Sequence, residues 1–181
     1  MVKPYLIKQQ LSPEQNKVLD EVLFQRADTV IAYKILSRQY SETKRKIKAI
    51  EKKLIVMMQE LGEKDFTPRR IEGEIAAIEN KYPVIDKAIK NYKEDMRNFD
   101  HLIGMPNFRI FNPERPDDWH IRGMRSHLRS AEMYIDRGLD ALRITKRYFK
   151  NITEAFQWHN EMQKLRKYRQ LTKPVTEPIT N

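Results

Sequence analysis

The sequence predicts an all-α protein in which a long antiparallel helical hairpin packs with a third long helix. Over two long stretches, apolar residues recur at alternating spacings of three and four, the pattern of helices that pack along a shared seam. The chain has only 5 Gly among 181 residues and is 33% charged, which disfavours a loop-rich β protein. We expect an elongated bundle with extended arms at both ends.

The first helix is expected over about 13–61, where its start signals are specific. Ser12 can cap the helix, Pro13 occupies the first helical position, and Gln15 completes a capping box. Gly62 is the expected stop, because glycine tolerates the backbone conformation that ends many helices.

The second helix is expected over about 68–104. Pro68 follows Thr67 as a start signal, and Gly104 with Pro106 just beyond it marks the end. Pro83 falls inside this span without disturbing the apolar spacing, so we expect a kink there rather than a helix end.

The two seams match when the chain folds back on itself. A turn just after Gly62 would place Ile47 opposite Ile85 and Tyr33 opposite Phe99. The spacing therefore predicts a coiled-coil-like hairpin over residues 13–104.

A third helix is expected over about 118–171. Asp117 or Asp118 can cap it, and small residues such as Gly138 in the middle of its seam would allow close helix approach. After Phe156 the apolar residues shift to another stripe, which predicts a kink or a new packing partner there.

These elements give the expected domain organisation. Residues 1–12 form an arm, 13–171 a single elongated helical domain, and 172–181 an extended tail. Within the domain, the Pro-rich segment 105–118 connects the hairpin to a basic helix over 119–171.

Positive charge points to a nucleic-acid partner. The chain has 35 Lys and Arg against 25 Asp and Glu, and residues 119–173 alone hold 13 basic and 5 acidic residues, a net of +8. Basic stripes of this kind can follow a phosphate backbone, although the charged outer face of a coiled coil is the simpler interpretation. The candidate phosphate-binding residues are Lys34, Arg38, Arg45, Lys48, Lys52, Arg122, Arg125, Arg129, Arg143, Lys146, Arg147, Lys150, Lys164, Arg166, Lys167 and Arg169.

Apolar residues outside the hairpin seam predict a second kind of surface. They either pack within the chain or bind another copy, because such surface is rarely left in water. The candidate self-assembly residues are Val18, Leu19, Val22, Leu23, Val30, Ile31, Trp158, Met162 and Leu165.

Catalytic chemistry finds little support. With no Cys, thiol catalysis and Cys-based zinc sites are excluded, and the sequence has no phosphate-binding Gly loop. The four His residues do not form a recognised metal-ligand set, so we expect neither an enzyme nor a cofactor or metal. No apolar run is long enough for a membrane span, and Met1–Tyr5 lacks the apolar core of a signal peptide. We therefore expect an intracellular or virion location.

Two functions remain open. The first is a structural protein that self-assembles and coats or packages nucleic acid, with double-stranded DNA favoured and no sequence preference. A helical nucleocapsid or virion coat protein, or an architectural protein, would fit it. The alternative is a coiled-coil scaffold or adaptor that binds protein partners through the apolar helix extensions.

Overall fold

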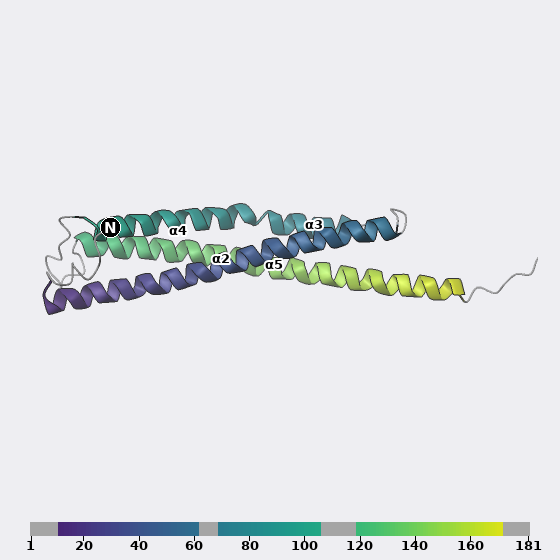
Figure 1. Cartoon of the computed structure of the whole chain (residues 1–181), viewed down its shortest axis with the longest axis horizontal. Coiled ribbons are helices and arrows are strands. Elements are labelled where there is room, and N and C mark those ends of the chain that lie inside the picture. Colours follow the sequence, from purple (N-terminus) through teal and green to yellow (C-terminus); the bar gives the residue numbers. More distant parts are fainter. Residues whose placement is uncertain (1–10, 62–68, 106–118, 172–181) are drawn as a thin grey trace, which may run out of the picture. The chain divides into compact units, whose positions relative to one another are not determined.

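The computed structural model of the chain describes residues 11–61, 69–105 and 119–171, apart from the side chains at 60–61 and 169–171. These residues form the helices α2 (Pro13–Leu61), α3 (Arg69–Glu79), α4 (Tyr82–Ile103) and α5 (Trp119–Leu171), coloured along the chain in Figure 1. The all-α class and the packing of a long hairpin with a third helix are confirmed. Three predicted parts lie outside the described residues: positions 106–118 of the Pro-rich connection, the tail, and residues 1–10 of the arm.

The predicted capping box begins α2. The Ser12 backbone N–H donates to Gln15 Oε1 at 2.8 Å, and the Gln15 backbone N–H donates to Ser12 Oγ at 3.2 Å. These two bonds satisfy donors that the first helical turn leaves without partners. The helix then runs unbroken for 49 residues.

The second arm of the hairpin is two helices rather than one kinked helix. It is interrupted at Asn80 and Lys81, and Pro83 lies in the first turn of α4. Proline has no N–H to donate and its ring clashes with the carbonyl four residues earlier, here Glu79, the last residue of α3. The Pro83 ring therefore favours a new helix start over a kink. As predicted, α4 ends just before Gly104, whose N–H contacts the carbonyls of the last turn.

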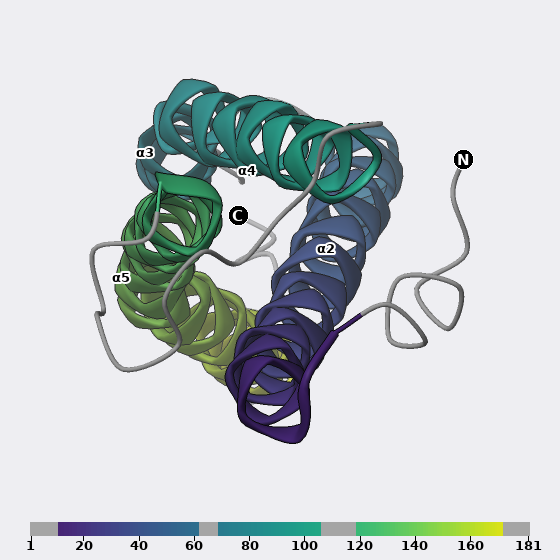
Figure 2. The same ribbon diagram turned by 90° about the vertical axis from the view of Figure 1, so that its left-hand side faces the viewer.

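The contacts of the chain divide into two compact units. Unit 1 contains the described residues up to Lys46 and from Lys81 to Ile144, and unit 2 contains those of Ile47–Asn80 and from Thr145 onwards. Unit 1 thus combines the first part of α2 with α4 and the first part of α5 (Figure 2).

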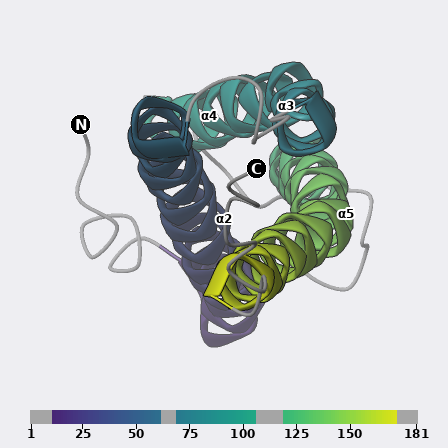
Figure 3. The same ribbon diagram turned by 90° about the vertical axis from the view of Figure 1, so that its right-hand side faces the viewer.

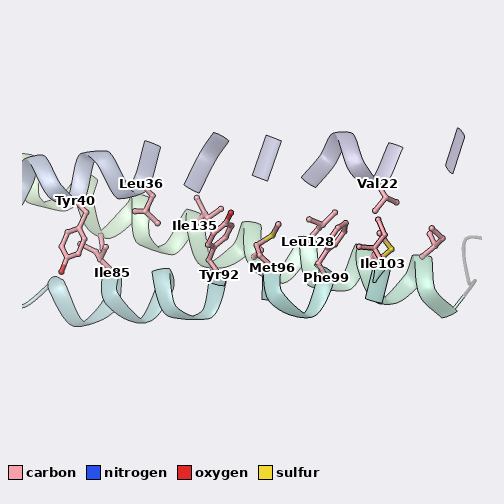
Figure 4. Packing of buried hydrophobic residues seen from close by; sticks show 14 of the residues in the cluster. Val22, Leu36, Tyr40, Ile85, Tyr92, Met96, Phe99, Ile103, Leu128 and Ile135 are labelled. Carbon is pink, nitrogen blue, oxygen red and sulfur yellow. The ribbon is translucent and has the colours of Figure 1, made fainter. Parts of the chain in front are cut away.

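A continuous apolar core holds unit 1 together. Leu36 of α2, Phe99 of α4 and Leu128 of α5 are all fully buried, and the side chains of the three helices point toward one another in Figure 4. Gly138 allows the close approach predicted for α5. A Cβ there would lie 2.9 Å from both Cδ atoms of Leu36 and 3.4 Å from the Cβ of Ala88.

The register of α2 against α4 differs from the predicted one by a heptad. Tyr33 stacks on Tyr92, with ring centroids 4.0 Å apart, instead of lying opposite Phe99. Arg26 lies opposite Phe99 instead, and its guanidinium is 5.6 Å from the centroid of the Phe99 ring. A seven-residue apolar repeat presents the same face after a shift of one heptad, so the spacing alone could not distinguish the two registers.

A polar cluster also ties α2 to α5 within unit 1. Glu132 Oε1 accepts hydrogen bonds from Gln25 Nε2 and Thr29 Oγ1, each at 3.2 Å. Thr29 is buried, and its hydroxyl also contacts the Gln25 carbonyl at 2.8 Å. Polar groups buried in this way favour one helix alignment because any other would leave them unsatisfied.

Unit 2 has a core of its own, from the end of α2, α3 and the rest of α5 (Figure 3). Leu54, Ile78 and Ile152 are buried there. Asn151 Nδ2 donates to Glu74 Oε1 at 2.9 Å, which joins α5 to α3. Lys53 Nζ lies 4.2 Å from the centroid of the Phe156 ring and so joins α2 to α5.

After Phe156, where a kink or a new packing partner was predicted, α5 continues as one helix and its buried stripe goes on to His159. Trp158 and Leu165, on the shifted stripe, are exposed, so a new packing partner for them stays a prediction. The pKa of His159 is lowered by burial and then by the charge of Arg166, so this histidine is a neutral core residue near pH 7.

Candidate nucleic-acid interface

The carboxylates of α4 are largely engaged inside unit 1. Asp100 accepts from Arg26 at 2.9–3.2 Å through both of its oxygens, and Asp95 Oδ1 lies 3.0 Å from His127 Nδ1. Asp86 Oδ1 accepts the hydroxyl proton of Tyr40 at 2.9 Å. Three of the four carboxylates of this helix therefore contact α2 or α5, while Asp86 and Glu94 remain exposed.

The cations of α4 show the opposite arrangement. All of them are exposed, and none forms an ion pair with a residue that the structure describes: Lys87, Lys90, Lys93 and Arg97. Sequence reasoning missed this group, because as many acidic as basic residues occur along α4. The positions of Lys87, Lys90 and Arg97 opposite the apolar seam were the signal that could have identified them.

The positive surface continues on the flank of α4 that faces α2. Lys93 lies one heptad from both Asp86 and Asp100, which contact α2, so it shares their side of the helix. On α2, Lys44 Nζ lies 4.0 Å from the Tyr40 ring centroid and 5.4 Å from that of Tyr82. Lys44 and Lys93 thus border the same seam between the two helices. We call the exposed positive surface along this seam the α2–α4 flank.

The predicted basic stripe of α2 is exposed along its whole length. Lys34, Arg38 and Arg45 belong to unit 1, whereas Lys48 and Lys52 belong to unit 2. Arg38 Nε pairs with Glu42 Oε1 at 2.9 Å, and Arg45 Nε lies 3.4 Å from the Ser41 carbonyl. Such exposed pairs are worth only about 0–1 kcal/mol, so Arg38 can exchange Glu42 for another anion.

In unit 1, the predicted residues of α5 have mixed environments. Arg122 and Arg129 are exposed. Arg125 is half-buried and its Nη2 lies 3.7 Å from Glu21, while Arg143 pairs with Asp140 at 2.7 Å. Arg122 and Arg129 therefore present the more accessible charges.

In unit 2, α5 exposes most of its cations. Lys150 Nζ lies 3.7 Å from Glu154, an exposed pair. Lys146, Arg147, Lys164, Arg166 and Lys167 are also exposed, whereas the side chain of Arg169 lies outside the described residues.

The predicted self-assembly residues differ in how far their side chains are exposed. Leu19 and Val22 are buried in the core of unit 1, so for them the prediction is corrected and intramolecular packing is the outcome. These positions face α4 and α5 because they continue the seam of α2 toward its start. Val18, Leu23 and Val30 pack partly against the same core, and Met162 is half-buried. Ile31, Trp158 and Leu165 remain exposed.

A shallow polar hollow of about 250 Å³ lies between α4 and α5 in unit 1. Its lining combines two carboxylates with amide and hydroxyl groups: Asn91, Glu94, Asp95, Asn98, Ser130 and Tyr134. Among the described residues, no group of three or more His, Asp or Glu side chains could hold a metal ion. The hollow has the wrong charge for phosphate, which leaves the exposed cations as the candidate site.

Comparison of the chain with protein families, with curated proteins and with solved structures finds no match. Within the part of the chain that the structure describes, no helix combines the length and apolar character of a membrane span.

Proposed function

We propose that this protein is a non-enzymatic structural protein that binds nucleic acid without sequence preference and self-assembles on it. The observation that supports this most is the separation of charge on α4. Its four cations face outward without ion pairs among the described residues, while three of its carboxylates are engaged within unit 1. Such a surface attracts polyanions more strongly than the balanced composition of the helix indicates.

The dimensions of the α2–α4 flank suit a duplex. From Lys87 to Arg97 the helix rises by about 15 Å. That length of B-form DNA carries roughly nine phosphate charges, more than enough to engage every cation of the flank. Lys44 of α2 adds a further charge near the start of α4, 5.4 Å from the Tyr82 ring centroid, and Lys34 lies exposed on α2.

Backbone contact rather than base reading is the proposed mode. Sequence-specific proteins place a few side chains against base edges in a groove, usually from a recognisable motif. Here the exposed groups are mostly lysines, which act as point charges toward phosphate. A nucleocapsid or architectural protein that coats double-stranded DNA, or RNA, fits this surface.

Salt dependence tests the proposal. We expect binding to a random-sequence duplex to weaken by several orders of magnitude between about 50 and 200 mM salt, because phosphate contacts release counterions. Replacing Lys93 and Arg97 by Gln should weaken binding to all sequences alike and lower the slope of log K against log salt by about 0.9 for each charge removed. Fluorescence anisotropy measures both quantities.

The matched control is Lys17→Gln. Lys17 is exposed on α2 close to Glu14, Asp20 and Glu21, so it lacks the positive surroundings of the α2–α4 flank. We expect this variant to bind like the wild type. Absence of duplex binding at low salt, or an equal loss in the control, would contradict the proposed interface, and a change in sequence preference would contradict the backbone mode.

The scaffold alternative is supported by a different observation. Phe24 is 70% exposed and Ile31 is 56% exposed on the outer face of α2 in unit 1. Exposed apolar groups on one helix face are typical of protein-binding surfaces. Salt-insensitive binding of a protein partner that is lost in Phe24→Ser, without any duplex binding, would favour this second function.

A further inference from the structure

Unit 2 leaves large apolar side chains exposed on two of its helices. On α2, Ile55 is 55% and Val56 48% exposed, and on α5, Trp158 is 62% and Leu165 52% exposed. Both groups lie away from the buried residues of the unit, such as Leu54 and Ile152. Apolar side chains gathered on one helix face often mark a contact with another protein.

The two apolar groups have flanks of opposite charge. Lys48 and Lys52 precede Ile55 on the same face of α2, both exposed and without an ion pair among the described residues. We call these residues, with Val56, the α2 patch. On α5, Trp158 and Leu165 alternate along one face with Glu154 and Glu161, which are also exposed, and these four residues form the α5 patch.

Among the residues that the structure describes, one weak ion pair involves these patches. Lys150 Nζ lies 3.7 Å from Glu154, and the two side chains are 76% and 51% exposed. A pair this open contributes about 0–1 kcal/mol and gives way readily to a better-placed cation. The α5 patch is therefore an apolar surface with available negative charge.

The spacing of the two patches matches in an antiparallel alignment. Lys52 precedes Ile55 by three residues, and Trp158 precedes Glu161 by three. When the helices run antiparallel, Ile55 facing Trp158 brings Lys52 opposite Glu161 one turn away. A parallel alignment with Val56 facing Trp158 would instead bring Lys52 opposite Glu154, a carboxylate that already lies 3.7 Å from Lys150 Nζ, whereas Glu161 has no such pair among the described residues.

We propose that the α2 patch of one copy of the chain packs antiparallel on the α5 patch of a second copy. The inference rests on the self-assembly part of the proposed function and names the surfaces that carry it. It also assigns Lys48 and Lys52 to a contact between copies, in place of the phosphate contact that the basic stripe indicated. A two-fold dimer would use both patches of each copy at once.

Charge reversal at one matched pair tests the contact. We expect the wild type to self-associate, and Lys52→Glu and Glu161→Lys each to weaken association at least about tenfold, because each places like charges together. Mixing the two variants should restore association, since Glu at position 52 then faces Lys at position 161 in the other chain. Sedimentation velocity measures each sample, with circular dichroism to verify the fold.

Lys34→Glu is the matched control, an equal charge change at an exposed site of α2 in unit 1. Its self-association should be unchanged. A monomeric wild type, unaltered association in both reversals, or a mixture that stays dissociated would each overturn the inference.

Failure of this contact is distinguishable from failure of nucleic-acid binding. Glu161→Lys adds positive charge, so it should bind a duplex too short for two copies at least as tightly as the wild type, even though its self-association is weakened. If it binds the short duplex but associates like the wild type, only the contact is wrong. If neither it nor the wild type binds, the nucleic-acid function fails and the contact stands on sedimentation alone.

Discussion

Tyr40 shows how a single residue couples the core of unit 1 to pH. Its ring is buried, and its hydroxyl donates to Asp86 Oδ1 at 2.9 Å. Burial, followed by the hydrogen bond and the negative charge of Asp86, raises the pKa of Tyr40 above its ordinary value. The folded state therefore holds the phenol proton more tightly than the unfolded state does.

A pH-dependent stability follows from this difference. The contribution of Tyr40 is fully present below the unfolded pKa of about 10 and is lost as the pH rises through the folded pKa. We expect Tyr40→Phe to lower the free energy of unfolding by about 1 kcal/mol near neutral pH. The difference in free energy of unfolding between wild type and variant should shrink well above pH ~10, because only the wild type has this phenol and loses stability when it ionises. Urea unfolding measures this difference near neutral pH and at the higher pH. An equal difference at the two pH values would contradict the role given to the Tyr40 hydroxyl.

Gly138 is the residue at which helix approach is closest. Because a Cβ there would overlap Leu36, Gly138→Val is expected to lower the free energy of unfolding by about 1–3 kcal/mol. Gly73, on the exposed face of α3, has nothing within 4 Å of the corresponding position. Gly73→Ala should therefore raise stability by about 0.5–1 kcal/mol through helix propensity. Thermal unfolding distinguishes the two, and a harmless Gly138→Val would show that the helices are farther apart.

At the scale of the elements, the break between α3 and α4 is the main departure from a simple hairpin. In a continuous helix the Pro83 ring would clash with the carbonyl of Glu79, and the chain instead starts a new helix at Tyr82. The break also coincides with the boundary between the two units, at Asn80 and Lys81. One proline thus separates a short arm in unit 2 from a long arm in unit 1.

Pro83→Ala tests this explanation. Alanine restores the N–H and removes the ring clash, so Asn80 and Lys81 are expected to join a continuous helix. Cα chemical shifts of residues 79–83 measured by NMR should move to helical values, while those of residues near Tyr92 stay unchanged. Unchanged shifts at 79–83 would show that packing, not the proline, imposes the break.

For the whole molecule, the net charge of +10 understates how the charge is presented. Contacts across helices, such as Arg26 with Asp100 and Gln25 with Glu132, engage a few of the acidic groups. Cations such as Lys93 remain outside, where salt and polyanions reach them. This separation, together with the two oppositely flanked apolar patches of unit 2, is the basis on which we propose assembly on a nucleic acid.

Much of the fold was predictable because it depends on local spacing. The capping box at Ser12 and Gln15, the end of α4 before Gly104 and the faces that become buried all follow from residues a few positions apart. The exposure of the basic stripe of α2 also followed, because its residues lie opposite the seam. Its role in phosphate binding stays a prediction.

Tertiary structure alone decided the register, the charge pairing and the fate of the apolar extensions. A heptad repeat is unchanged by a shift of one heptad, so only contacts such as Tyr33 with Tyr92 distinguish the alignments. Which carboxylates are engaged, and whether Leu19 is buried while Trp158 is exposed, depends on neighbours far away in the chain. Local periodicity carries no information about those neighbours, because it records which face of a helix is apolar and not what covers that face.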